Sequence, residues 1–251
     1  MSLVKAEVRD HVGWLTLADP GHRNVLGKRL SEDLAAAVSG VLVQQARAIV
    51  LDAEPPAFCA GGSLDDLLAR EQPLAESYAG YLALAQAPVP TIAVVAGAAI
   101  GAGVSLAVAC DVVLAGEENA RFDPRFLDIA IHPGGGHLWL LARRVGPQGA
   151  AALVLLGDTL TGPEAERHGL AWRCVPEAEL MPLATRLAER AAGRSAALVQ
   201  RTKQTLRDSA AAASLEEAHA LELQAQEWSV AQPEFQASVE RIRAAIRAKG
   251  K

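Results

Sequence analysis

The 251-residue sequence is poor in aromatic side chains, which make up 4% of it, although 51% of its residues are hydrophobic. Ala, Leu and Val must therefore form most of the core, and the length suits one large domain with a smaller appendage. Positive charge is also limited, because the formal net charge is -5 and the sequence has no run of Lys or Arg. This balance argues against a general nucleic-acid-binding protein.

Cysteine is rare, and no stretch has the features of a secretion or membrane segment. Cys59, Cys110 and Cys174 are widely spaced and odd in number, which favours reduced thiols over a paired-cysteine metal site. Residues 1–10 are charged, so we expect no signal peptide and a cytoplasmic protein. Residues 89–110 carry no charge, but a proline and several glycines interrupt them, and we expect a buried strand and helix there instead of a membrane span.

Hydrophobic periodicity predicts alternating strands and helices in the first two thirds of the chain. Leu30, Leu34, Val38 and Val41 recur at helical spacing. Short apolar or alternating runs predict strands at residues 4–9, 12–18, 47–53, 91–96 and 112–115. Helices are expected at residues 69–87 and 102–109, with an almost wholly helical region after residue 146. A strand, a glycine turn and a helix thus follow one another twice, which indicates a coil of ββα units.

Two glycine-rich stretches carry the strongest functional signal. They cover residues 57–68 (AFCAGGSLDDLL) and residues 96–111 (AGAAIGAGVSLAVACD). Each places small residues just before an apolar helical run, so each can present a bare backbone N–H at a helix N-terminus. Two such donors that converge on one oxygen form an oxyanion hole. The glycines do not match a dinucleotide fingerprint, and no HxxxH, DxD or Cys/His cluster predicts a metal site.

Further motifs stand in a recognisable order around these stretches. They are Arg23-Asn24, Phe122 and the HPGGG run at residues 132–136. With these motifs the chain resembles the crotonase superfamily, and within it the enoyl-CoA hydratase/isomerase family. The resemblance implies an α/β crotonase (ClpP-like) fold, with a spiral of ββα turns over residues 1–190 and a helical trimerisation region over residues 191–251. It also implies a homotrimer, or a hexamer of two trimers.

The resemblance implies a ligand and a set of binding residues. The ligand is an acyl-CoA thioester, so coenzyme A belongs to the substrate and no separate cofactor, nucleic acid or membrane partner is expected. The backbone N–H groups of Gly62 and Ala102 correspond to the oxyanion donors, which would stabilise a thioester enolate. The positions that correspond to coenzyme A contacts are Arg23, Ala60, Gly62, Ser63, Leu64 and Asp65.

The residues for proton transfer depart from the family's pattern. Hydratases of this family use two glutamates, and the matching positions here are Ser105 and Phe126, neither of which transfers a proton near pH 7. The sequence shows no histidine partner that would make Ser105 a nucleophile. Asp128 is one candidate substitute, because an extended segment would place it on the same side as Phe126.

Two histidines are further candidate substitutes. His132 precedes a Pro-Gly turn, and His137 stands where a helix is expected to begin. Each also has a structural interpretation, as a histidine that bonds to the backbone or lies in a subunit contact. The sequence therefore leaves two functions open: an enzyme with a relocated acid–base group, or a non-catalytic acyl-CoA-binding homologue. For an enzyme, it also leaves open atypical hydration, double-bond isomerisation and C–C or thioester cleavage.

Overall fold

The computed structural model of the chain describes residues 2–69 and 73–249. The chain divides into two compact units, residues 1–192 and residues 193–251. The boundary expected from the sequence lies after residue 190. No helix among the described residues is both long and apolar enough to cross a lipid bilayer.

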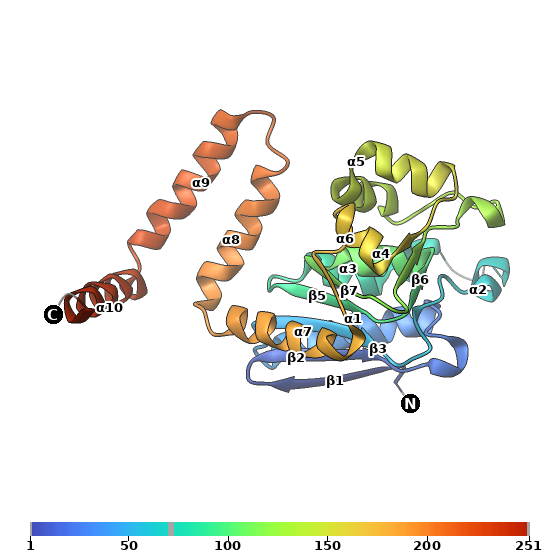
Figure 1. The fold of residues 1–251 in the computed structure, drawn as a ribbon, viewed down its shortest axis with the longest axis horizontal. Helices are drawn as coiled ribbons and strands as arrows, with labels where there is room; N and C mark the ends of the chain where they lie inside the picture. The colour runs from blue at the N-terminus through green and yellow to red at the C-terminus, as the bar shows by residue number, and fades with distance from the viewer. Residues whose placement is uncertain (1, 70–72, 250–251) are drawn as a thin grey trace. The chain divides into compact units, whose positions relative to one another are not determined.

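The first unit is built on a six-stranded sheet, in which all neighbouring strands are parallel except the first pair, β1 and β2 (Figure 1). The strands predicted at residues 4–9 and 12–18 are confirmed by this pair, which forms a hairpin. The strand order is β1 (Val4–Arg9), β2 (Val12–Leu17), β3 (Ala48–Ala53), β5 (Thr91–Val95), β7 (Val112–Gly116) and β10 (Arg173–Val175).

A smaller sheet receives the second strand of each ββα unit. Its order is β4 (Ala57–Cys59), β6 (Ala98–Ile100), β8 (Arg121–Asp123) and β9 (Leu160–Thr161). The chain thus runs from β3 to β4 and then to helix α2 (Leu64–Ala69), and again from β5 to β6 and then to helix α4 (Ala102–Ala109). This alternation between two sheets confirms the predicted coil of ββα units.

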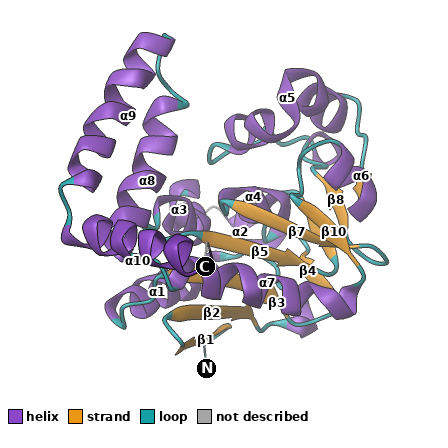
Figure 2. Cartoon of the chain, turned by 60° about the vertical axis from the view of Figure 1, so that its left-hand side comes forward, coloured by secondary structure: helices purple, strands orange, loops and turns teal. Residues whose placement is uncertain are grey.

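Helices cover both faces of the six-stranded sheet (Figure 2). On one face, helix α1 (Lys28–Val43) packs with its predicted apolar stripe, together with α3 (Ala79–Gln86) and the buried helix α4. On the other face, α7 (Glu177–Ala192) packs its row of Leu180, Ala184 and Ala188 against strand residues such as Val50. The small side chains of this row allow the helix to lie close to the sheet.

The remaining elements connect these layers. In the first unit they are η1 (Pro20–His22), η2 (Leu74–Tyr78), η3 (Leu127–Ile129), α5 (His137–Leu155) and α6 (Gly162–Arg167). In the second unit, α8 (Ala196–Ser209), α9 (Leu215–Val230) and α10 (Pro233–Lys249) follow one another.

Two expectations from the sequence need correction. Residues 69–87 do not form one helix in their described part, because Pro73 precedes the 3-10 turn η2 and the helix resumes only at α3; residues 70–72 lie outside the described part. The region after residue 146 contains the strands β9 and β10 in addition to its helices. These strands are two and three residues long, and their partners β8 and β7 lie far away in sequence, so no local periodicity reveals them.

Candidate functional site

The two glycine turns lie against each other, because the strands that lead into them are neighbours. Strands β4 and β6 pair in parallel, with Ala57 opposite Ala98. Gly61 follows β4 with φ 107°, and Gly101 follows β6 with φ 49°, a backbone region that favours glycine. A Cβ atom on Gly61 would stand 3.2 Å from the carbonyl oxygen of Ile100. The close approach of the two turns therefore depends on a glycine at position 61.

Gly62 and Ala102, the residues after these two glycines, line the same pocket. The turn at Gly62 is held by the N–H of Leu26, which donates to the carbonyl oxygen of Gly61 at 2.8 Å. Ala102 is the first residue of α4, where backbone N–H groups have no acceptor within the helix and the helix dipole is positive. The fold thus brings both predicted donor residues to one cavity on rigid backbone.

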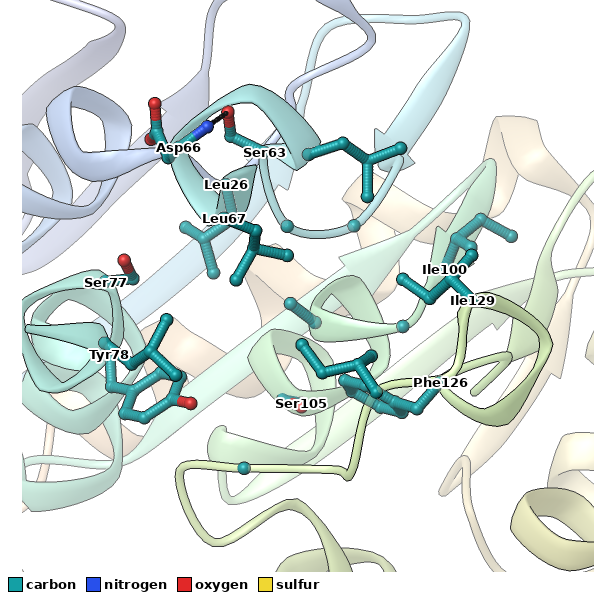
Figure 3. A pocket seen from close by; sticks show the side chains of 18 of the residues that line it. Leu26, Ser63, Asp66, Leu67, Ser77, Tyr78, Ile100, Ser105, Phe126 and Ile129 are labelled. Atoms are coloured by element: carbon teal, nitrogen blue, oxygen red, sulfur yellow. Dashed lines mark hydrogen bonds between the residues drawn. The ribbon is translucent and has the colours of Figure 1, made fainter. Parts of the chain in front are cut away.

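The exposed surface of the pocket is mostly apolar, and polar groups stand at separate points of its wall (Figure 3). This composition is typical of small-molecule sites. The apolar side chains come from Leu26, Leu64, Leu67, Leu74, Ile100, Phe126, Ile129 and Ile131, and the polar ones from Ser63, Asp66, Ser77, Tyr78, Tyr81, Ser105, Arg125 and His132.

A second hollow adjoins this pocket and shares part of its wall. Five of the six residues predicted to contact coenzyme A line it, namely Ala60, Gly62, Ser63, Leu64 and Asp65. Its wall carries charged side chains of both signs: His22, Lys28 and Arg29 together with Asp19, Glu32, Asp66 and Glu76. The sixth residue, Arg23, is exposed, and its carbonyl oxygen accepts the N–H of Ala60 at 3.0 Å.

Ser105 and His137 form a buried hydrogen bond beside the apolar pocket. Ser105 lies in α4 and lines the pocket, and its Oγ is 2.8 Å from Nδ1 of His137, the first residue of α5. The His137 Nε2 atom is buried and has no hydrogen-bond partner among the residues that the structure describes. The expectation that Ser105 lacks a histidine partner is therefore wrong.

The environment of His137 keeps its ring neutral and in place. Its side chain is completely buried, and this burial lowers the pKa of His137 from 6.5 to about 4. The ring of Phe126 packs edge-on against it, with 4.7 Å between the ring centroids. Ser105 and Phe126, the two residues at the glutamate positions of the family, thus both contact the same imidazole.

The other two candidate substitutes have different surroundings. Asp128 lies in the 3-10 turn η3, not in an extended segment, so the argument that placed it beside Phe126 is wrong; its side chain is exposed and is not among the described residues of the pocket wall. His132 does line the pocket, but its Nδ1 is 2.7 Å from the carbonyl oxygen of Pro133 and acts as donor to it.

Two contacts in the pocket wall were not predicted from the sequence. Arg125 lines the pocket and its Nε donates to the buried carboxylate of Asp123 at 3.0 Å; its place one residue before Phe126 was a usable signal. The hydroxyl of Tyr81 donates to the carbonyl oxygen of Gly135 at 2.8 Å, across 54 residues of sequence. That bond ties α3 to the glycine loop before His137, and no local pattern predicts it.

Comparison with known proteins agrees with this geometry. The family model of enoyl-CoA hydratase/isomerase matches residues 7–244. The chain belongs to the enoyl-CoA hydratase/isomerase family. A probable enoyl-CoA hydratase of Mycobacterium tuberculosis is 40% identical over 248 residues, which cover 93% of this chain and 94% of that protein. The 2,3-dehydroadipyl-CoA hydratase of Escherichia coli is 34% identical over 199 residues, 78% of each chain.

Solved structures show that the enoyl-CoA hydratase/isomerase fold extends over nearly the whole chain. Human enoyl coenzyme A hydratase domain-containing protein 3 superposes with a TM-score of 0.90 at 26% identity, covering 97% of this chain and 98% of that one. An enoyl-CoA hydratase subunit of Geobacillus kaustophilus gives a TM-score of 0.89 at 26% identity, covering 98% and 96%. The crotonase fold expected from the sequence is confirmed.

Proposed function

We propose that this chain is an acyl-CoA enzyme that acts through a thioester enolate held by the backbone N–H groups of Gly62 and Ala102. The observation that carries this proposal is that both residues follow a positive-φ glycine and line one pocket. Membership of the enoyl-CoA hydratase/isomerase family supports the same ligand class.

The chemistry follows from where charge develops. When a base takes a proton from Cα of the thioester, a role for which the described pocket wall offers Nε2 of His132, negative charge moves onto the carbonyl oxygen, and two fixed donors about 2.7–3.1 Å away stabilise it. The N-terminus of α4 behind Ala102 adds partial positive charge. Loss of one such donor costs about 2.7–4 kcal/mol in the barrier.

The two adjoining hollows suit the two ends of an acyl-CoA. The apolar pocket, with Leu67, Ile100 and Ile131 in its wall, would take the acyl chain. The second hollow would take the coenzyme A part, with Lys28 exchanging its ion pairs to Glu32 and Glu76, both at 3.7 Å, for phosphate groups. The thioester then lies at Gly62, which lines both hollows.

The protonating machinery differs from a two-glutamate hydratase in this proposal, because Ser105 and Phe126 occupy the glutamate positions. A general acid–base group is worth roughly 10²–10⁴-fold in rate, so a conventional hydratase rate is not expected. The same absence favours the second candidate function, a non-catalytic acyl-CoA-binding homologue that retains only the two backbone donors.

Assembly into a trimer, or a hexamer of two trimers, is part of the proposal. Helix α9 buries none of its residues in the single chain, and apolar side chains are exposed along α9 and α10, including Leu215, Phe235 and Ile246. Such surfaces are typical of subunit contacts. Analytical ultracentrifugation tests this directly: a monomer at micromolar concentration contradicts it.

The decisive experiment compares binding and enolisation in the same protein. Calorimetry with butanoyl-CoA measures binding, and deuterium uptake at Cα in D2O measures enolate formation. Ala102→Pro removes one N–H at a helix position where proline is tolerated, and Ala102→Gly keeps the N–H as a matched control. We expect deuterium uptake to fall about 100-fold or more in the proline variant and to persist in the glycine variant.

The possible outcomes separate the two candidate functions. Deuterium uptake by the unaltered protein supports the enzyme. Tight binding of butanoyl-CoA without uptake supports the binding homologue, and absence of binding contradicts both.

A further inference from the structure

The Ser105–His137 pair is not explained by enolate chemistry, since it lies where that chemistry would need a carboxylate. We propose that Ser105 is a nucleophile and His137 its general base, so that the pocket hydrolyses acyl thioesters through an acyl-serine intermediate. This inference rests on the proposed function only for the binding of a thioester at Gly62 and Ala102.

The position of Ser105 on α4 suits attack at a carbonyl held by Ala102. Ser105 follows Ala102 by three residues, so both lie on the same face of the helix within one turn. Side chains in a helix lean toward its N-terminus, which directs Oγ of Ser105 toward the end that carries the Ala102 N–H. The nucleophile and both oxyanion donors therefore line one pocket, as acyl transfer requires.

His137 has the distance and protonation state of a base for this hydroxyl. Its Nδ1 is 2.8 Å from Oγ, within the range for direct proton transfer. Burial keeps the imidazole neutral, and the tautomer with its proton on Nε2 leaves Nδ1 free to accept the Ser105 proton. Contact with the Phe126 ring fixes the plane of the imidazole.

The pair differs from a catalytic triad in one respect that sets its speed. In a triad, a carboxylate bonds to the second ring nitrogen and stabilises the imidazolium that forms. Here Nε2 of His137 has no such partner among the described residues. We therefore expect slow hydrolysis. We also expect the activity to persist to a lower pH than in a hydrolase whose histidine base has an ordinary pKa, because the imidazole of His137 stays neutral down to about pH 4.

The reaction balances without any further reactant except water. Oγ of Ser105 forms a bond to the carbonyl carbon while Nδ1 of His137 takes its proton, and the oxyanion accepts from Gly62 and Ala102. The C–S bond then breaks, and the coenzyme A sulfur leaves with the proton from His137. Water attacks the acyl-serine, again giving its proton to Nδ1, and the release of a carboxylic acid returns a proton to Oγ. Nothing is oxidised or reduced.

The test measures binding, thiol release and covalent acylation on the same samples. The unaltered protein is incubated with butanoyl-CoA or decanoyl-CoA, free coenzyme A is quantified by chromatography, and acid-quenched protein is analysed by mass spectrometry with peptide mapping. We expect one acyl group on Ser105, and release of coenzyme A that falls at least about 100-fold in Ser105→Ala and His137→Gln. Ser39→Ala, an exposed serine on α1, is the matched control and should release coenzyme A at the unaltered rate.

Each contrary outcome has a definite meaning. Binding of both thioesters by calorimetry with no release of coenzyme A overturns this inference and leaves the proposed function standing. Release that persists in Ser105→Ala, or deuterium uptake that depends on Ser105 without any acyl group on the protein, also overturns it. Absence of binding overturns both proposals. Peptide mapping uses the unaltered protein, so the result does not depend on whether a variant folds.

Discussion

Helix α4 lies so close to strand β4 that a Cβ atom on Gly103 would stand 2.3 Å from the carbonyl oxygen of Cys59. Helix α4 and strand β4 cannot move apart at this contact without shifting Ala102, the residue next to Gly103. We therefore expect Gly103→Ala to lower the free energy of unfolding by about 1–3 kcal/mol, as overpacking typically does. Gly40→Ala, in α1 with open space around it, is the matched control and should be neutral or raise the stability by up to about 1 kcal/mol. Urea denaturation of both variants measures this, and equal stability would contradict it.

The burial of His137 predicts a pH dependence of stability. Its pKa is lowered to about 4 in the folded chain, against 6.5 for the ordinary side chain. Between these values the unfolded chain binds a proton that the folded chain does not, so the contribution of His137 is complete above about pH 6.5 and is lost as the pH falls toward 4. The loss amounts to about 3 kcal/mol.

Denaturation curves at pH 7, 5.5 and 4.5 measure this effect. The loss of unfolding free energy between pH 7 and 4.5 should be smaller in His137→Gln. His168→Gln, which alters an exposed histidine, should show the same loss as the unaltered chain. An identical slope in His137→Gln and in the unaltered chain would show that another group causes the pH dependence.

Asn24, which does not line the pocket, is expected to contribute strongly to the free energy of unfolding. It is fully buried, its Nδ2 donates to the carbonyl oxygens of Glu54 and Ala57 at 2.8 Å each, and its Oδ1 accepts the N–H of Asp19 at 2.9 Å. Asn24→Ala leaves one buried and two partly buried backbone groups without this partner, and we expect a loss of about 2–4 kcal/mol. Asn119→Ala, at an exposed site, should change the stability by less than about 0.5 kcal/mol. Comparable losses in both variants would contradict this account.

A side chain at position 101 is expected to weaken binding of butanoyl-CoA through its effect on the backbone, without a steric clash. Nothing lies within 4 Å of a Cβ atom at this position, but its φ of 49° with ψ of -112° is rarely adopted by residues with side chains. Gly101→Ala must either retain about 1–3 kcal/mol of strain or rotate the following N–H of Ala102. We expect weaker binding of butanoyl-CoA by calorimetry, while Gly21→Ala, which has equal space and no positive φ, should bind normally. Unchanged affinity in Gly101→Ala would show that this turn does not orient a donor.

Local signals in the sequence were sufficient for the elements that position the pocket. The period of Leu30, Leu34 and Val38 predicted α1, and the small residues before an apolar run predicted α4 with its first residue at Ala102. Ser63 caps the helix that follows it, since its Oγ accepts the N–H of Asp66, three residues later, at 3.1 Å. In each of these cases, residues close in sequence determine the structure.

The features that the sequence analysis missed depend on contacts between distant segments. The hydrogen bond between Ser105 and His137 exists only because α5 packs on α4, 32 residues later. The position expected for Asp128 was wrong because η3 replaces the extended segment. A turn of three residues is too short to leave a periodic pattern in the sequence. Side-chain pairing across the fold therefore had to come from the structure.

The two donors at positions 62 and 102 belong to the main chain, so binding of the carbonyl oxygen does not depend on the side chains that carry out the reaction. A substitution at either residue leaves an amide hydrogen in place unless it introduces proline, whereas a change at 105 or 126 replaces the reactive group outright. The scaffold can therefore exchange one reaction for another by single substitutions while the carbonyl stays held, so the resident chemistry of such a chain must be determined from its side chains one position at a time.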